Sequence, residues 1–433
     1  MKYFERILFN EIKKWVDRKE IISIKGPRQS GKTTLLNMLM EWLEKEKSVK
    51  KENIIFLTFE DKEILEKFFL NPKDFVKKFV LDESQRYYFL IDEAHYCKDV
   101  GQKLKLLYDS YQNIKFIITG SSSLEITSET AKFLVGRLLS FELLPLSFYE
   151  FLNSRDNGLA KMFLEKYKLV ENLILKGKDF EIPKNDIFIN DMLRYFEEFV
   201  LFGGYPEVAK AENEDEKKII LKNIFNTYLD KDIVSYLQIT DTIKFRKLVS
   251  IFSMLIGGII KFESLCSQTK SYFKEITYLT DVLEQTYVIR LVRPFYKNLV
   301  TELRKNPKVY FLDYGIRNYA INNFNPLEKR SDAGNLAENF ILNEIKPVSE
   351  NLFLNFWRTT AKAEVDFIVS NSNSGIIPIE VKFEEFRKER IGRSLYSFIR
   401  NYSPQFAIVV TKDFWGEKIF NSTKVKFIPI AYF

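Results

Sequence analysis

Two glycines, a lysine and a threonine stand near the start of the chain at a spacing that suits phosphate chemistry. The segment 26–36, GPRQSGKTTLL, fits the pattern G-x-x-x-x-G-K-[ST], after an apolar run, IISIK, and before a helical pattern. Glycines allow a tight backbone path, and the loop amides and the helix N-terminus face a phosphate. Lys32 reaches the outer phosphates and Thr33 can hold Mg²⁺. The segment therefore predicts an ATP site lined by Gly26, Pro27, Arg28, Gln29, Ser30, Gly31, Lys32, Thr33 and Thr34.

An acidic pair follows a second apolar run. YYFLIDEA (87–94) places Asp92 and Glu93 at the C-terminal end of a predicted strand, where open α/β sheets hold their ligands. Asp92 suits the metal shell and Glu93 can orient the attacking water, so both join Lys32 as candidate catalytic residues. A glycine loop or a strand-terminal acid alone could be purely structural. Because both occur in this order, we expect ATP hydrolysis with Mg²⁺.

Two further candidates for the nucleotide site come later in the chain. KFIITGSSS ends another apolar run, and Ser121 or its neighbour Ser122 could hydrogen-bond the γ-phosphate or the water. A hydroxyl-rich turn is also a common way to end a strand. Arg137 is the candidate for a charge-neutralising arginine, from the same chain or from a neighbouring subunit of a homo-oligomer. A surface arginine is the other interpretation, and the sequence leaves both open.

A second set of polar residues lies in the last third of the chain. In PIEVK (378–382), Glu380 and Lys382 stand two positions apart, so on a strand they share one face. Asp366 stands in an earlier apolar run, and Glu338 lies on a predicted helix upstream. Hard Mg²⁺ prefers carboxylate oxygens, so Asp366 and Glu380 can hold one ion with Glu338 assisting. Lys382 could position the attacking water or stabilise developing charge, and Mn²⁺ is an alternative ion.

These four residues match, in order and element type, the PD-(D/E)xK arrangement of metal-dependent nucleases. The first strand acid is preceded by Glu364 and Val365, where that arrangement has a Pro-Asp dipeptide. An E-x-K pair is also compatible with a cross-strand ion pair, or with a charged edge strand that resists aggregation. The sequence therefore leaves two possibilities for this domain. It either cleaves DNA, or it keeps an inactive nuclease fold that only binds DNA or a protein.

Basic residues in the middle of the chain indicate a nucleic-acid contact. FESLCSQTKSYFKEITYLTDVLEQ suggests a helix, a turn at 267–269 and a second helix. Ile276, Leu279 and Leu283 fall at i, i+3 and i+7, which predicts one buried face. In a helix-turn-helix protein the opposite face enters the major groove of double-stranded DNA. A winged helix used only for packing fits the same spacing. The residues predicted to contact DNA are Lys270, Lys274, Thr277, Arg290 and Arg293.

The elements that must position these residues change along the chain. Up to about residue 150, short apolar runs alternate with helical patterns, as in a parallel sheet with crossover helices. A mostly helical stretch follows, and then helices lead into YVIRLVRPFY, whose alternation suits a hairpin. From about 307 the chain is rich in predicted strands: LFLNFW, AEVDFIVS, IIPIEVKF, FAIVVT and KVKFIPIAYF. The fold class is therefore α/β with several domains.

Several segments together resemble a known family. GPRQSGKTTLL, FLIDEAH, ITGSSS, GRLLSFELLPLSFYEFL and FGGYPEV are similar to prokaryotic and archaeal AAA-type P-loop ATPases that carry a C-terminal restriction-endonuclease-like domain of unknown function. YLDKDI, LDYGIRN, GNLAENFI, EVDFIV and IEVK extend the resemblance over nearly the whole chain. It implies a P-loop ATPase core at 1–150, a helical lid at 151–215, a winged-helix domain at 216–300 and a restriction-endonuclease-like α/β domain at 301–433.

Length and composition set bounds on these interpretations. A chain of 433 residues with 46% hydrophobic content can bury more than one core. A formal net charge of +7 weakly favours polyanionic partners. Cys97 and Cys266 have no motif partner, which predicts neither a disulfide framework nor a zinc ribbon and favours the cytoplasm. The longest apolar run, LVSIFSMLIGGII (248–260), is shorter than the ~20 residues that span a bilayer. We expect a buried helix there and no membrane partner.

Three functions fit these features. In the first, ATP hydrolysis drives a conformational change that acts on DNA through the winged helix and the nuclease-like domain. In the second, a nucleotide-dependent switch or scaffold keeps an inactive nuclease fold that binds DNA or a protein. In the third, only the ATPase is active and the rest of the chain is an oligomerisation surface. ATP and ADP are the expected small-molecule partners in each.

Overall fold

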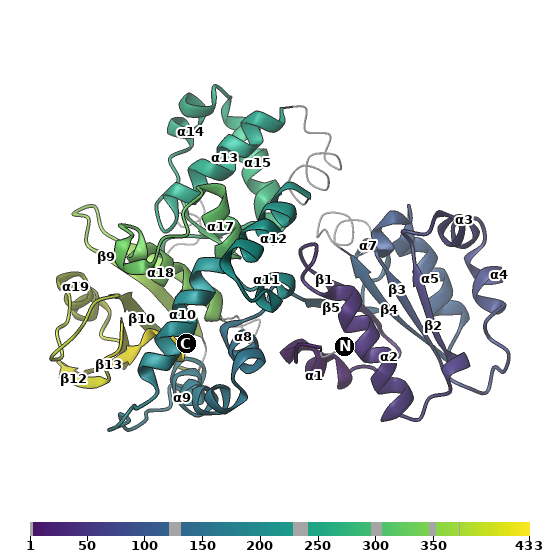
Figure 1. Ribbon diagram of the computed structural model, residues 1–433, viewed down its shortest axis with the longest axis horizontal. Coiled ribbons are helices and arrows are strands. Elements are labelled where there is room, and N and C mark those ends of the chain that lie inside the picture. Colours follow the sequence, from purple (N-terminus) through teal and green to yellow (C-terminus); the bar gives the residue numbers. More distant parts are fainter. Residues whose placement is uncertain (1–2, 121–130, 228–240, 296–304, 346–351, 372) are drawn as a thin grey trace. The chain divides into compact units, whose positions relative to one another are not determined.

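The computed structural model describes residues 3–120, 131–227, 241–295, 305–345, 352–371 and 373–433 (Figure 1). Over the described residues the chain forms two compact units. The first comprises Met1–Leu146, Tyr205–Glu207 and Asp281–Val288, and the second comprises Ser147–Gly204, Val208–Thr280 and Ile289–Phe433. The predicted division into four parts is finer than these two units and remains a prediction.

The first unit is built on a parallel sheet. In its described part the sheet has five strands, in the order β2-β3-β4-β1-β5, and every pairing is parallel. The strands are β1 (Ile21–Lys25), β2 (Ile54–Thr58), β3 (Tyr87–Asp92), β4 (Ile114–Gly120) and β5 (Leu138–Glu142). The helices are α1 (Ile7–Lys13), α2 (Lys32–Lys45), α3 (Lys62–Leu70), α4 (Pro72–Lys77), α5 (Val100–Ser110) and α7 (Ala131–Phe133), with single 3₁₀ turns η1 (Lys51–Asn53) and η2 (Ala94–Tyr96).

Both faces of this sheet are buried, which explains why its strands are continuously hydrophobic. Along β3, Phe89 and Ile91 pack into the core beneath α3, α4 and α5. The intervening Tyr88 and Leu90 pack into the opposite core, beneath α1 and α2. A strand that is buried on both faces needs apolar residues at every position, which is the pattern the sequence shows. The predicted parallel sheet with crossover helices is confirmed (Figure 1).

The second unit begins with a largely helical part. Its helices are α8 (Phe148–Arg155), α9 (Asn157–Lys176), α10 (Ile189–Phe202), α12 (Glu214–Asn226), α13 (Thr242–Leu255), α14 (Phe262–Thr269), α17 (Tyr314–Ala320) and α18 (Ala333–Glu344), with the 3₁₀ turn η5 (Leu327–Lys329). Two more helices, α11 (Pro206–Lys210) and α15 (Phe273–Gln285), contribute residues to both units. α13 buries Phe245, Leu248, Val249 and Phe252, so the long apolar run at 248–260 begins as the expected buried helix.

The predicted turn at 267–269 is wrong. These residues form the last turn of α14, which ends at Thr269. The buried Thr269 hydroxyl donates to the Leu265 carbonyl of the same helix at 2.7 Å. The chain turns at Lys270 instead, which adopts the left-handed conformation with φ 53°. The predicted hairpin is confirmed, since β6 (Ile289–Val292) pairs antiparallel with β7 (Lys308–Phe311).

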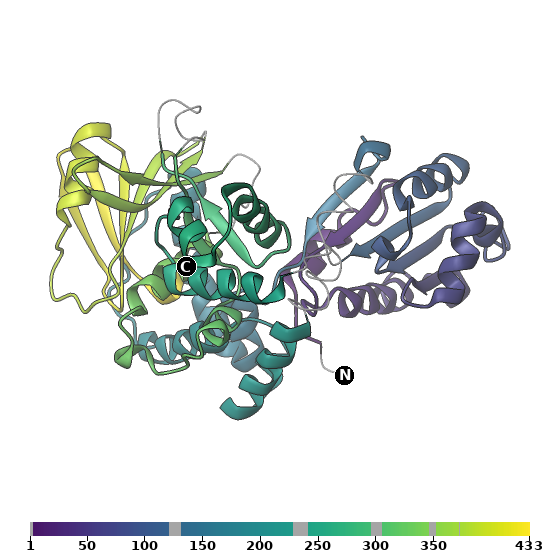
Figure 2. The same ribbon diagram turned by 90° about the horizontal axis from the view of Figure 1, so that it is seen from above.

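The C-terminal part of the second unit is a mixed sheet (yellow and green in Figure 2). Across its described residues it has six strands, ordered β12-β13-β11-β10-β9-β8. β8 to β10 run antiparallel, β10, β11 and β13 run parallel, and β12 returns antiparallel to β13. The bounds are β8 (Phe353–Arg358), β9 (Glu364–Asn371), β10 (Gly375–Val381), β11 (Phe406–Thr411), β12 (Gly416–Phe420) and β13 (Thr423–Pro429), with α19 (Arg393–Tyr402) and the 3₁₀ turn η6 (Ile430–Tyr432). All five predicted strands are present.

Two of the segments that carry the family resemblance interlock in this unit. Asp313, from LDYGIRN, caps α17 by accepting the Ile316 amide at 2.9 Å, and it also accepts the Gly204 amide at 2.8 Å. A Cβ on Gly203 would lie 2.4 Å from the Asp313 carboxylate oxygens, so only glycine fits there. Gly203 of FGGYPEV is therefore required for packing against this aspartate.

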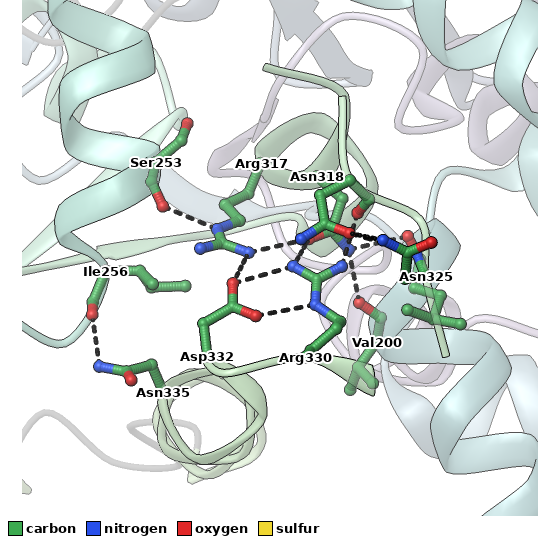
Figure 3. Close-up of polar contacts among 11 residues, drawn as sticks. Val200, Ser253, Ile256, Arg317, Asn318, Asn325, Arg330, Asp332 and Asn335 are labelled. Atoms are coloured by element: carbon green, nitrogen blue, oxygen red, sulfur yellow. Dashed lines mark hydrogen bonds and ion pairs between the residues drawn. The ribbon is translucent and has the colours of Figure 1, made fainter. Parts of the chain in front are cut away.

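A buried polar network joins several helices of the second unit (Figure 3). Arg317 on α17 and Arg330 after η5 both contact Asp332, at 2.6 Å and 2.8 Å. Asn318 accepts from both arginines at 3.0 Å and donates to the Val200 carbonyl on α10 at 2.9 Å. Arg317 Nε also donates to a carbonyl near the end of α13. The network thus links α10, α13 and α17 to the segment that precedes α18.

Two expectations drawn from composition can be compared with the structure. Both cysteines are free in the structure. Within the described ranges, no helix is both long enough and apolar enough to cross a bilayer.

Candidate nucleotide and carboxylate sites

Strand order brings the predicted nucleotide residues together. β4 lies between β1 and β3, so the loop after β1, the end of β3 and the end of β4 meet at the carboxyl edge of one sheet. This is the edge where open α/β sheets bind ligands. The loop 26–31 leads directly into α2, and Thr34 is exposed in the first turn of that helix.

The glycines of the loop meet two different requirements. Gly26 has φ 155°, and a Cβ there would lie 2.1 Å from the Leu143 carbonyl oxygen, so a side chain is excluded. Gly31 has φ 98° and forms the N-cap of α2, a conformation that glycine adopts without strain. The Lys32 ammonium donates to the carbonyls of Gly26 at 3.1 Å and Pro27 at 3.0 Å. Lysine and loop therefore form a compact cradle at the helix N-terminus.

Asp92 accepts hydrogen bonds from two hydroxyls. Thr33 donates to Oδ2 at 2.7 Å, and Thr119 at the end of β4 donates to Oδ1 at 2.5 Å. The Thr33 hydroxyl and the Asp92 carboxylate are hard oxygen donors, the type that Mg²⁺ prefers. The residues present therefore fit a magnesium ion. Sequence reasoning missed Thr119 and chose Ser121, which lies outside the described residues, although Thr119 stands in the same quoted run.

Glu93 is held at the end of β3 by its backbone and its neighbours. Its φ of 52° is left-handed, and its amide donates to the Thr119 hydroxyl at 2.9 Å. His95 Nδ1 lies 3.0 Å from Glu93 Oε2. Burial raises the pKa of the carboxyl, but the contact with His95 and the charge of Lys32 outweigh it, so the pKa of Glu93 is lowered. Glu93 is therefore ionised at neutral pH, as a residue that orients water must be.

Arg6 is a residue of this site that the sequence did not reveal. Its guanidinium is 6% exposed and donates to the carbonyls of Ser30 at 2.8 Å and Leu144 at 2.6 Å. It thus ties the phosphate-binding loop to the segment that leaves β5. Arg6 stands in an N-terminal stretch of mixed polar and apolar residues without a motif, so no local pattern distinguishes it from a surface arginine.

Arg137 does not lie at the nucleotide site of its own chain. Its carbonyl accepts the amide of Ile21, the first residue of β1, and Leu138 pairs with that same residue. The phosphate-binding loop follows Lys25 at the other end of β1, about 13 Å away at ~3.3 Å per residue. Arg137 Nε contacts Asp109 at 3.2 Å. This position contradicts a role in the same chain, whereas a surface arginine and a role in a neighbouring subunit are both compatible with it.

In the C-terminal sheet, strands β9 and β10 bring three predicted residues together. Asp366 Oδ2 accepts the Val381 amide at 2.7 Å, and Lys382 Nζ lies 3.4 Å from Glu380 Oε1. β10 pairs with both β9 and β11, so the interpretation of PIEVK as a charged edge strand is wrong. Burial and the nearby Glu338 carboxylate raise the pKa of Asp366.

Glu380 is buried against the start of α19. A Cβ on Gly392, the N-cap of α19, would lie 2.7 Å from both Glu380 oxygens. A helix N-terminus stabilises a nearby negative charge. Burial nevertheless raises the pKa of Glu380, with the charge of Lys382 acting against it.

Glu338 has contacts that the sequence did not predict. Its Oε1 lies 2.8 Å from Lys308 Nζ and accepts the Tyr310 hydroxyl. The same ammonium lies 2.7 Å from Glu364 Oε1. Among the residues that the structure describes, no three His, Cys, Asp or Glu side chains converge to hold a metal ion. A metal held by Asp366 and Glu380 would therefore depend on water and substrate for its other ligands, as Mg²⁺ commonly does.

The residues predicted to contact DNA lie in different environments. Lys270 and Lys274 are exposed around the turn and the first turn of α15. The Thr277 hydroxyl donates to the Phe273 carbonyl of its own helix at 2.9 Å. Arg290 lies on β6, Arg293 follows that strand, and both are partly buried. The face of α15 predicted to be buried is confirmed, since Ile276, Leu279 and Leu283 are all in the core.

Three family models match successive parts of the chain. Residues 18–152 match an AAA domain, residues 193–327 match a domain of unknown function (DUF8612), and residues 333–433 match another (DUF4143). The first match spans β1 to β5 and includes the phosphate-binding loop and Asp92.

Two of the similar proteins are named as uncharacterized proteins. One from Methanocaldococcus jannaschii is 26% identical over 95% of this chain and 86% of its own length. Another, from Haemophilus influenzae, is 25% identical over 83% of this chain and 82% of its own length. Among solved structures, the Aeropyrum pernix ORC2 protein in its ADP form matches with a TM-score of 0.34 and 11% identity, over 70% of this chain and 87% of that one. A likeness this low supports no inference. The family match and the site geometry agree that the first unit contains an AAA-type P-loop ATPase domain.

Proposed function

We propose that the first unit binds and hydrolyses ATP. The observation that carries the proposal is the pair of hydroxyl contacts on Asp92, which link the phosphate-binding loop through Thr33 to the end of β4 through Thr119. Glu93 stands directly beside this pair, ionised and held by its own backbone conformation. A loop for the phosphates, an acid for the metal shell and an acid for the water thus lie at one sheet edge.

Each side chain has a distinct task in this proposal. The loop amides and Lys32 bind the phosphates, so the Lys32 ammonium moves from the loop carbonyls to the outer phosphate oxygens. Thr33 and Asp92 would hold Mg²⁺, which supplies charge neutralisation at the phosphates. Glu93 orients the attacking water and accepts its proton. Arg137 from a neighbouring subunit is the proposed source of additional positive charge in a homo-oligomer.

Replacement of Lys32 tests this function. In Lys32→Ala we expect ATP turnover to fall by about 100-fold or more, because the developing phosphate charge loses a direct partner. Steady-state phosphate release would be measured on protein whose circular dichroism matches the wild type. Lys19→Ala, which removes a surface ammonium 2.7 Å from Gln112, is the matched control and should retain turnover. Wild-type turnover in Lys32→Ala would exclude this assignment.

The arrangement of Asp366, Glu380 and Lys382 supports a proposal of a second activity, metal-dependent cleavage of DNA. These residues come together on adjacent strands, as the nuclease-like interpretation requires. We propose that ATP hydrolysis acts through the winged-helix region on double-stranded DNA. In this scheme Asp366 and Glu380 would hold Mg²⁺ or Mn²⁺, and Lys382 would stabilise the charge on the scissile phosphate. The rival proposal is that this part binds DNA or a protein without cutting.

Cleavage assays separate these two proposals. Incubation of plasmid DNA with the protein and Mg²⁺ or Mn²⁺ should yield nicked or linear product if the site cuts. Asp366→Ala and Lys382→Ala should each abolish the product because they remove a metal ligand and the charge-stabilising group. DNA retention in a gel-shift assay without any product would favour the binding-only role. Equal cleavage by both variants would exclude these residues from the mechanism.

A further inference from the structure

We propose that Lys308 is the resident cation between Glu338 and Glu364, and that it excludes a divalent metal ion from these two carboxylates. The inference builds on the proposed C-terminal site and refines it, because it restricts a metal there to Asp366 and Glu380. It also gives Lys308, which no motif marks, a defined role.

The contacts of Lys308 resemble those of a bound cation. Its ammonium lies 2.8 Å from Glu338 Oε1 and 2.7 Å from Glu364 Oε1, and the residue is only 2% exposed. A lysine that is buried this deeply would lose its proton unless carboxylates surrounded it. Both contacts join the ammonium directly to a carboxylate oxygen, so these two acids balance its charge.

Of the remaining oxygens of the two carboxylates, that of Glu364 is ion-paired and that of Glu338 lies near the backbone at Gly257. Glu364 Oε2 lies 3.3 Å from Arg358 Nη1. Glu338 Oε2 faces Gly257, where a Cβ would lie 3.2 Å from it. Tyr310 donates its hydroxyl to Glu338 Oε1 beside the ammonium. A metal ion bound by Glu338 and Glu364 would need the space that Lys308 Nζ occupies.

Local structure fixes the ammonium in this place. Lys308 and Tyr310 stand two positions apart on β7, so both side chains project from one face of the strand toward Glu338. β7 pairs with β6, and Lys308 also forms a backbone bridge with Ile259 beyond α13. Neighbours on both sides of the strand thus prevent the lysine from moving away from the carboxylates.

Replacement of Lys308 by methionine tests the proposal. Lys308→Met keeps an unbranched side chain that lacks only the position of Nζ, and it removes the charge. We expect this variant to bind one more Mn²⁺ per chain than the wild type, counted by electron paramagnetic resonance without nucleotide. Its melting temperature should fall, and Mn²⁺ should raise it again. An equal Mn²⁺ count in variant and wild type would overturn the proposal.

Lys217→Met is the matched control, since Lys217 is also buried and contacts one carboxylate, that of Glu198. It should lose stability without gaining a Mn²⁺ ion. If Lys308→Met does not fold alone, refolding on addition of Mn²⁺, or rescue by the added change Glu338→Gln, supports the proposal, and failure of both overturns it. The difference between the Mn²⁺ counts of the wild type and Asp366→Ala reports on the site of Asp366 and Glu380, so failure of that proposed metal site is distinguishable from failure of this inference.

Discussion

At the scale of single residues, long-range contacts decide which charged side chains lie at the two candidate sites. Lys32, Asp92 and Glu93 could be predicted because glycine spacing and strand-terminal position are local features of the sequence. Arg6 and Lys308 could not, because their importance comes from carbonyls and carboxylates that are distant in sequence. Arg137 shows the opposite case, since its type suggested a role at the phosphates and strand register contradicts that role within the same chain.

Arg6 provides a prediction at this scale. In Arg6→Met, the free energy of unfolding should fall by about 3 kcal/mol, because two hydrogen bonds from a buried charged group are lost. Affinity for a fluorescent ATP analogue should fall as well, since the Ser30 carbonyl loses its support. Urea unfolding and analogue titration measure the two effects. Arg18→Met removes an exposed arginine and should change stability by less than about 0.5 kcal/mol. Equal effects of the two changes would contradict the role of Arg6.

Thr119 provides a second prediction. Thr119→Val keeps the branched shape and removes the hydroxyl that donates to Asp92 and accepts from the Glu93 amide. We expect kcat for ATP to fall by about tenfold or more, because both acids lose a common partner. Thr119→Ser retains the hydroxyl and should keep most of the activity. If Thr119→Val turned over ATP as fast as Thr119→Ser, the hydroxyl would have no part in the reaction.

At the scale of elements, continuous apolar runs made the strands predictable. The order of the strands in the sheet could not be predicted in this way. Nothing local in the sequence places β4 between β1 and β3, yet this order brings Thr119 to Asp92. β12 was missed because most of its side chains are exposed and carry little apolar pattern. α19 was missed although Leu395, Phe398 and Ile399 recur at helical spacing, which was a usable signal.

The network around Asp332 provides a prediction for the helices it joins (Figure 3). Burial raises the pKa of Asp332, but the contacts with Arg330 and Arg317 have the larger effect. Together they lower this pKa from 3.8 to about 2. Because the folded pKa is depressed, the unfolded chain binds the proton first as the pH falls. The stabilising effect is therefore present above about pH 4 and is lost as the pH falls toward 2.

Asp332→Asn tests this behaviour. At pH 7 the variant should be less stable by about 3 kcal/mol, because two buried guanidinium groups lose their shared carboxylate. The difference from the wild type should shrink between pH 4 and pH 2, as measured by urea unfolding across that range. Asp191→Asn, at an exposed ion pair with Arg194, should have little effect at any pH. A constant difference across the range would show that the charge of Asp332 does not stabilise the network.

At the scale of the whole molecule, the central question is whether the two units act on one another through DNA. We predict that double-stranded DNA stimulates ATP hydrolysis. The double change Lys270→Ala and Lys274→Ala should remove this stimulation, since both ammonium groups are exposed and available to phosphates. Fluorescence anisotropy over a salt series should show the slope of log K against log salt reduced by about 2. Lys388→Ala, an exposed lysine after β10, should change neither quantity. Stimulation that persists in the double variant would assign DNA contact to another surface.

The position of His95 has a practical consequence. The chain contains a single histidine, and its ring lies 3.0 Å from the carboxylate proposed to orient water. A label at Cε1 of histidine would therefore give one imidazole signal, without need of assignment, from the carboxyl edge of the sheet. Nucleotide binding at the proposed site should displace this resonance, as should exchange of ATP for ADP or the change Glu93→Gln. The single histidine thus offers a spectroscopic reporter of the proposed nucleotide site.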